Sequence, residues 1–195
     1  MKLPLNCDVE YLPEFLTEKE TGQLYDSLIN QYGLDKSRLI IDVEGQRIET
    51  DSFKILFATE RLMNQRSHLE KAHGRVFQWE GLMQELRTRV EEFTGKAYEV
   101  AMCIYYPDGN SFAPYHYDPE TSGAKTVLPS LSLGAVREFA FKESDSGEVY
   151  SLNLANGSLL VMADYCQQRY VHSLLKDETC KAGRINITFR ESAFA

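Results

Sequence analysis

Hydrophobic and polar positions alternate along much of the C-terminal half of the chain, and this alternation predicts a series of short β-strands. In the stretch 184–190 the alternation is complete, with Ile185, Ile187 and Phe189 on one face and only polar residues on the other. The expected strands cover residues 100–105, 130–135, 137–142, 149–154, 158–162 and 184–190. Short strands in such number are typical of a β-sandwich or jelly roll.

The N-terminal half shows a helical pattern. Thr17 followed by Glu20 is a capping box, which predicts the start of a helix that ends at Gly33. A second helix is expected over residues 79–93, where apolar residues recur every three or four positions. The order of helices and then strands predicts an α+β fold.

Two stretches between these helices do not show a helical pattern. Residues 38–57 predict two or three strands with a turn at 44–46. Residues 58–77 show no clear period, and their length favours a loop or lid that covers something else. The N-terminal helices are therefore expected to come with a lid-like extension.

Composition limits the function only loosely. The 195 residues suit a single domain, and no apolar run is long enough to span a membrane. The N-terminus lacks the features of a secretory signal, and the four cysteines are scattered without metal-site spacing, so a reducing, cytoplasmic setting is expected. The net charge of −8 argues mildly against broad attraction to nucleic acid.

One stretch is basic, although the chain as a whole has a negative net charge. Residues 54–79 carry more basic than acidic side chains. Such a stretch is most often a solvated face, but it is also the only plausible place for phosphate contacts.

The segment around His116 holds the first candidate chemistry. His116 and Asp118 are two residues apart, so on a β-strand their side chains point the same way. With a distant histidine, for which His172 is the best candidate, they would form the 2-His-1-carboxylate triad that holds Fe(II) and leaves positions open. The plain alternative is a histidine and an aspartate at a strand end that bond to each other or to water.

The polar face of 184–190 holds the second candidate. Such a face usually contacts water, but here it carries two arginines, an asparagine and a threonine, which would also suit a polar cavity. A guanidinium such as that of Arg184 binds a carboxylate through two parallel hydrogen bonds, which lysine cannot copy. A metal triad together with an inward arginine is what an iron- and 2-oxoglutarate-dependent oxygenase needs.

These motifs resemble the AlkB-like 2-oxoglutarate/Fe(II)-dependent dioxygenases, and the resemblance runs from about Trp79 to Arg190. It is carried by EEFTG, YYPDG, HYD, SLSLGA with the following REF, GSLLVM, YVHS and RINITFR. It implies a double-stranded β-helix, or jelly roll, with residues 1–96 as N-terminal helices and lid region and 97–195 as the catalytic core. The lid would recognise nucleotides.

The resemblance also implies roles for single residues. Fe(II) would be held by the triad, 2-oxoglutarate would be the co-substrate and O2 the oxidant. The far carboxylate of 2-oxoglutarate would pair with Arg184. Glu120 would face the substrate base, and the alternative for Glu120 is a solvated carboxylate in a loop. The implied iron ligands are His116, Asp118 and His172, and the implied co-substrate residues are Tyr106, Arg184, Asn186 and Arg190.

The chain departs from the family in its substrate-selecting half. Ile104 stands where the repair enzymes usually carry asparagine, so one co-substrate hydrogen bond is missing or comes from elsewhere. The usual Pro-Arg and aromatic lid signature is absent from residues 54–79. Phe77, Trp79 and Tyr115 are the candidates for the base-stacking residue.

The leading hypothesis is oxidative demethylation of N-alkylated nucleobases in DNA or RNA, with release of succinate, CO2 and formaldehyde. One alternative is the same chemistry on a protein side chain or a small metabolite. Another is a metal-binding barrel without catalysis. A cytoplasmic location, or a nuclear one in a eukaryote, is expected in each case.

Overall fold

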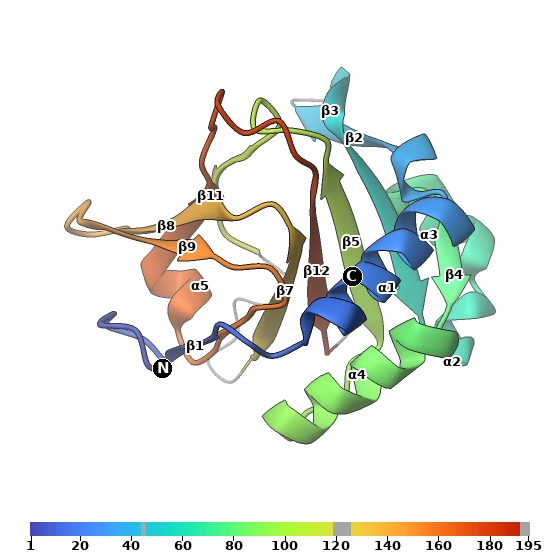
Figure 1. The fold of residues 1–195 in the computed structure, drawn as a ribbon, viewed down its shortest axis with the longest axis horizontal. Coiled ribbons are helices and arrows are strands. Elements are labelled where there is room, and N and C mark those ends of the chain that lie inside the picture. Colours follow the sequence, from blue (N-terminus) through green and yellow to red (C-terminus); the bar gives the residue numbers. More distant parts are fainter. Residues whose placement is uncertain (44–45, 119–125, 192–195) are drawn as a thin grey trace.

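Two β-sheets face each other in the computed structural model, which describes residues 1–43, 46–118 and 126–191 (Figure 1). The eight-stranded sheet of this described part consists of β1 (Val9–Leu12), β2 (Arg38–Val43), β3 (Gln46–Ala58), β4 (Val76–Gln78), β5 (Val100–Tyr106), β7 (Leu128–Gly134), β10 (Leu159–Met162) and β12 (Arg184–Arg190). The four-stranded sheet consists of β6 (Ala113–His116), β8 (Arg137–Glu143), β9 (Val149–Leu154) and β11 (Tyr170–Leu174).

The helices lie mostly on one side of the large sheet, and the small sheet lies on the other (Figure 1). The described helical segments are α1 (Glu18–Asp26), η1 (Ser27–Gln31), η2 (Leu34–Lys36), α2 (Glu60–Met63), α3 (Arg66–His73), α4 (Gly81–Thr94) and α5 (Cys166–Arg169). The predicted α+β class and jelly-roll core are confirmed, and the two sheets do not close into a barrel.

The large sheet has the strand order β1-β10-β7-β12-β5-β3-β2, with β4 paired to β3. All of these pairs are antiparallel except β3–β4. Strands from the N-terminal half thus extend the same sheet as the strands of the expected catalytic core. The division into residues 1–96 and 97–195 therefore stays a prediction about function.

The strand β12 divides the interior in two. Its residues Ile185, Ile187 and Phe189 are fully buried in a core formed with the helices α1 and α4. A second core lies between the sheets and includes Phe139 and Phe141 of β8. The polar residues of β12 face this second side, as the alternation in the sequence predicts.

The N-terminal capping box forms as expected. The Thr17 hydroxyl accepts from the backbone N–H of Glu20, and the Glu20 carboxylate accepts from the backbone N–H of Thr17. This helix is irregular beyond Asp26, where it continues as the π-helical turn η1 and the 3₁₀ turn η2.

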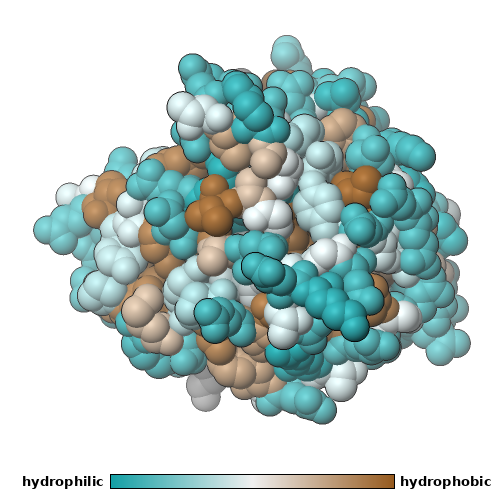
Figure 2. Space-filling model, viewed as in Figure 1, coloured by the Kyte–Doolittle hydropathy of each residue, from teal (hydrophilic) through white to brown (hydrophobic). Residues whose placement is uncertain are grey.

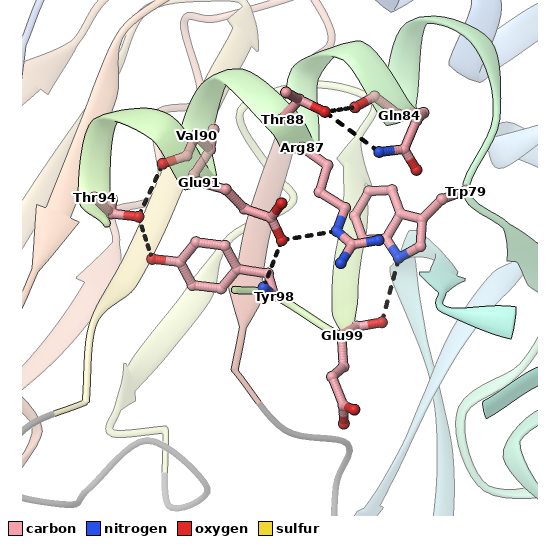
Figure 3. Close-up of polar contacts among 9 residues, drawn as sticks. All are labelled: Trp79, Gln84, Arg87, Thr88, Val90, Glu91, Thr94, Tyr98 and Glu99. Atoms are coloured by element: carbon pink, nitrogen blue, oxygen red, sulfur yellow. Dashed lines mark hydrogen bonds and ion pairs between the residues drawn. The ribbon is translucent and has the colours of Figure 1, made fainter. Parts of the chain in front are cut away.

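Helix α4 is tied to the start of β5 by polar contacts (Figure 3). The Trp79 indole N–H donates to the carbonyl of Glu99 at 3.3 Å, and the Glu91 carboxylate accepts from Arg87 and from the backbone of Tyr98. The Trp79 ring stacks on Phe189 with 6.2 Å between centroids. Trp79 is therefore a core anchor between the helix and the sheet.

Residues 58–77 differ from the loop or lid predicted for them. They contain α2, α3 and the start of β4, and their apolar residues Leu62, Leu69 and Val76 are buried against residues of β3 and β5. These residues are seven positions apart, so each short element contributes only one of them and no single element shows a period. The turn predicted at 44–46 lies largely outside the described residues.

The face that carries α1 and α4 is mainly hydrophilic, with small scattered apolar patches (Figure 2). No helix in the described part of the chain has both the length and the apolar character needed to cross a membrane.

Arg137 is a buried clamp between the two strands of the small sheet that carry candidate ligands. Its side chain is 1 % exposed. Its guanidinium donates to the carbonyls of Asp108, Gly109 and Ser111 at 3.1–3.3 Å and to the carbonyl of Leu175 at 2.6 Å. The first three carbonyls precede β6 and the fourth follows β11, so one side chain joins the two segments.

The turn held by Arg137 requires a glycine. A Cβ atom built on Gly109 would lie 1.7 Å from the carbonyl oxygen of Asp177. The backbones of Gly109 and Asp177 instead approach closely enough for the Asp177 N–H to donate to the Gly109 carbonyl at 2.9 Å.

We predict that Arg137→Met destabilises the protein by at least about 3 kcal/mol, because four carbonyls lose a buried, charged donor. Urea denaturation measures the change. Arg169→Met is the matched control, since Arg169 also donates to a backbone carbonyl, that of Asn6, but is exposed. Its expected loss is below about 1 kcal/mol. Equal losses in the two variants would contradict the clamp.

Candidate metal and co-substrate site

The backbone pairing of β6 with β11 brings the three predicted metal ligands together. His116 and His172 are directly paired across these strands, and their rings are 4.4 Å apart between centroids. Asp118 follows two residues after the end of β6. The ligand atoms of the three side chains all lie within 4.8 Å of one another.

Two of the three ligands are oriented by neighbours outside the triad. His116 Nδ1 is 2.7 Å from the carbonyl oxygen of Pro114, which leaves Nε2 free to bind a metal. The backbone N–H of Asp118 donates to the side chain of Gln167 in α5 at 3.0 Å. The Asp118 carboxylate also pairs with Arg190 at 2.8 Å.

The surroundings hold the ligands in the protonation states that a metal needs. Burial would raise the pKa of the Asp118 carboxyl, but His172 and Arg190 beside it outweigh this effect and lower that pKa below its ordinary value. Burial lowers the pKa of His172, so its imidazole is neutral near pH 7. A carboxylate and neutral imidazoles are metal-binding forms.

These residues fit a divalent iron. Two donors at right angles, each about 2.1 Å from an ion, lie about 3 Å apart. His172 Nε2 and Asp118 Oδ2 are 3.4 Å apart. Nδ1 of His172 is buried without a hydrogen-bond partner among the described residues. Two imidazoles and one carboxylate, here on β6, just after it and on β11, are the donor set of non-haem Fe(II) oxygenases.

The triad opens into a cavity of about 460 Å³ between the two sheets. This volume lies in the usual range for small-molecule sites, about 300–1,000 Å³. The charged side chains that line it are those of Lys54, Asp118, Arg184 and Arg190, and the triad histidines lie there too. Cations therefore outnumber anions in the described lining, and the cavity suits an anionic ligand.

Arg184 is a cation of this lining that no described acidic residue neutralises. It is 2 % exposed, and Nη2 donates to the Ser132 hydroxyl at 2.9 Å while Nε has no partner in the described part of the chain. Burial lowers the pKa of Arg184 to about 10, so it remains charged near pH 7. An unneutralised buried guanidinium is a site for a carboxylate.

The other expected co-substrate residues also line the cavity. Tyr106 is paired with Arg184 across β5 and β12, and burial raises its pKa, so its hydroxyl remains a donor. Asn186 donates to the Ser130 hydroxyl at 2.7 Å. Arg190 faces the cavity but pairs with Asp118, so here it supports a metal ligand.

The candidates for base stacking are not in the cavity wall. Phe77 packs against Phe57 and Tyr32, and Trp79 is 6 % exposed in the helix-side core. Tyr115 is exposed, with Lys142 over its ring. Glu120 lies outside the described residues.

Other residues line the mouth of the cavity and were not singled out from the sequence. Phe112 and Tyr117 are aromatic and about half exposed, at 48 % and 51 %. Ile40 and Ile41 of β2 and Lys54 of β3 also line it. Strands β2 and β3 therefore cover the cavity. No hydrophobic period in the sequence indicates this role, because it depends on how these strands lie relative to distant strands.

Comparison with known proteins agrees with this site. The sequence pattern of the 2OG-Fe(II) oxygenase superfamily matches residues 8–190. The chain therefore belongs to this superfamily, which confirms the expectation of Fe(II), 2-oxoglutarate and O2.

Within the superfamily the chain is similar to AlkB proteins over part of its length. It is 34 % identical over 122 residues to mouse DNA oxidative demethylase ALKBH2, an alignment that covers 58 % of this chain and 51 % of that protein. It is 31 % identical over 122 residues to rat alpha-ketoglutarate-dependent dioxygenase alkB homolog 3, covering 57 % and 41 %. It is 32 % identical over 107 residues to uncharacterized protein R406 of Acanthamoeba polyphaga mimivirus, covering 54 % and 56 %.

The chain spans about half the length of the curated relatives it matches. The solved structure of OsALKBH1 resembles the whole fold, with a TM-score of 0.62, 14 % identity and coverage of 96 % of this chain and 100 % of that one.

We predict that Asp118→Ala weakens Mn(II) binding by at least about a hundredfold, because the triad loses its only carboxylate. Isothermal calorimetry under anaerobic conditions measures this, with Mn(II) as a redox-stable substitute for Fe(II). Asp145→Asn, an exposed carboxylate in the turn after β8, is the control and keeps wild-type affinity. Unchanged binding in Asp118→Ala would show that the triad is not the metal site.

We predict that Arg184→Lys raises the dissociation constant for 2-oxoglutarate about tenfold and leaves Mn(II) affinity unchanged. A lysine keeps the charge but cannot form two parallel hydrogen bonds with a carboxylate. Calorimetric titration of 2-oxoglutarate into the Mn(II)-loaded variant measures the change. A loss of both affinities would point to misfolding, and no loss of either would remove Arg184 from the site.

Proposed function

We propose that this chain is an Fe(II)- and 2-oxoglutarate-dependent dioxygenase that removes N-alkyl groups from nucleobases. The observation that carries this proposal is the placement of a metal triad and an unneutralised, buried arginine in one cavity. When bound there, Fe(II), 2-oxoglutarate and O2 supply an oxidation that converts 2-oxoglutarate to succinate and CO2 and hydroxylates a C–H bond of the substrate.

The side chains of the cavity bind and orient the reactants. His116, Asp118 and His172 would hold the metal on one side of its coordination sphere. Arg184 would bind the far carboxylate of 2-oxoglutarate, and the Tyr106 hydroxyl would donate a hydrogen bond to it. The apolar residues around the triad limit the access of water, which protects the reaction from side products.

Two observations favour a nucleobase as the substrate. Two similar proteins are named DNA oxidative demethylase ALKBH2 and alkB homolog 3, and both names are AlkB names. The exposed rings of Phe112 and Tyr117 at the cavity mouth also suit stacking with a base that has left its helix. Loss of formaldehyde from a hydroxylated N-methyl group would leave the repaired base.

A protein side chain or a small metabolite is the second candidate substrate. The acidic net charge of −8 favours it, because broad attraction to phosphates is weak. A metal-binding protein without catalysis is a poorer explanation, because such a protein has no use for a buried Arg184 that no described carboxylate neutralises. As part of the proposal, the location is cytoplasmic, or nuclear in a eukaryote; the four unpaired cysteines support a reducing compartment.

The test is the release of succinate and formaldehyde by the protein with Fe(II), 2-oxoglutarate and ascorbate. Single-stranded oligonucleotides that carry 1-methyladenine or 3-methylcytosine are compared with unmodified strands of the same sequence. We expect formaldehyde only from the methylated strands, in amounts equal to the extra succinate. Succinate that does not depend on any oligonucleotide would overturn the nucleobase proposal and direct the search to proteins and metabolites.

A further inference from the structure

Lys54 is a cation in the cavity for which neither the triad nor Arg184 gives a role. It lies on β3, and its side chain is partly buried and lines the cavity. It has no hydrogen bond or ion pair from its amine to any described residue. Burial and the charge of Arg190 lower the pKa of Lys54. Even a partly buried, unneutralised ammonium group is unfavourable unless an anion offsets it.

The strand register places Lys54 in a row with two other cavity residues. Lys54 is paired with Ile104 across β3 and β5, and Ile104 is paired with Asn186 across β5 and β12. The three side chains line the cavity at the same level of the sheet. Ile104, in the middle, offers no hydrogen bond, so the polar contacts of this row come only from its two ends.

A 2-oxoglutarate bound to Arg184 reaches this row. Asn186 is two residues beyond Arg184 on β12, which is about 6.8 Å along the strand. The five-carbon chain of 2-oxoglutarate, at about 1.5 Å per bond, spans roughly 5 Å from one carboxylate carbon to the other. With one carboxylate on Arg184, its oxo-acid end therefore lies near the level of Lys54, Ile104 and Asn186.

The charges of the cavity agree with this placement. 2-Oxoglutarate carries two negative charges, and Arg184 offsets one of them. Arg190 is already paired with Asp118. Among the described lining residues, Lys54 is then the remaining cation for the second carboxylate.

We propose that Lys54 is a co-substrate-binding residue whose ammonium group donates to the oxo-acid end of 2-oxoglutarate, in place of a donor at position 104. This inference rests on the use of 2-oxoglutarate in the proposed function. It assigns a specific task to the β2–β3 hairpin region, which otherwise only covers the cavity. Because the Asn186 amide already donates to the Ser130 hydroxyl and the Leu131 carbonyl, Lys54 is the donor that this row offers to the carboxylate.

The test measures binding of 2-oxoglutarate to Mn(II)-loaded protein by calorimetry, without turnover. Lys54→Met is expected to raise the dissociation constant about tenfold or more, since a hydrogen bond from a charged donor is lost. Its Mn(II) affinity is expected to remain that of the wild type. Lys71→Met, an exposed lysine on α3, is the control and changes neither constant.

The second variant separates a direct contact from a structural effect. Ile104→Asn places an amide donor in the middle of the row, so in the Lys54→Met background it is expected to recover at least about a third of the lost affinity, on a logarithmic scale. A structural defect caused by Lys54→Met would not be repaired by a change at position 104. Lys54→Gln, which keeps a polar side chain, replaces Lys54→Met if the latter does not fold.

The outcomes distinguish the two proposals. If the wild type binds no 2-oxoglutarate, the proposed function itself fails. If the wild type binds it and Lys54→Met binds it equally well, the role of Lys54 is overturned while the proposed function stands. If Lys54→Met leaves binding of 2-oxoglutarate unchanged but weakens binding of the oligonucleotide, the proposed role of Lys54 is also overturned, because Lys54 would then contact the substrate.

Discussion

The rest of the structure depends on the complete alternation of apolar and polar residues along β12. This strand lies between β7 and β5 in the sheet, and its two faces look into the two parts of the interior. Ile185, Ile187 and Phe189 fill the core beneath the helices, whereas Arg184 and Asn186 face the cavity. A pairing shift of one residue would exchange the two faces and place a guanidinium in the apolar core. The same register therefore determines the packing and the chemistry of the site.

Buried cations give the cavity its preference for an anion. Each of the three buried arginines has a different environment. Arg137 is surrounded by four backbone carbonyls, and Arg190 is paired with Asp118. Arg184 donates to one serine hydroxyl and lies over the Tyr106 ring, and the Lys54 amine has no hydrogen bond or ion pair in the described part of the chain. Because a buried charge without an offsetting group is unfavourable, a dicarboxylate would stabilise this side of the protein as it binds.

Much of the site was predictable because its signals are local. His116 and Asp118 are close in the sequence, and the polar face of residues 184–190 follows directly from a period of two. The capping box at Thr17 also formed as predicted. The loop predicted for residues 58–77 was wrong, because their helices are short and each buries only isolated side chains against β3 and β5. The roles of Trp79 and Phe77 depended on which side of the sheet they face, and no local pattern reports this.

The sequence by itself determined the fold class, the ligand types and the faces of the strands, because these follow from residue chemistry and periods of a few residues. Only the tertiary structure decided which groups meet. The pairing of β6 with β11 places His172 beside His116, and the clamp by Arg137 joins segments 108–111 and 175. The row from Lys54 to Asn186 likewise depends on pairings between distant strands. Such long-range pairings are set by the packing of the whole chain, which no short stretch of sequence contains.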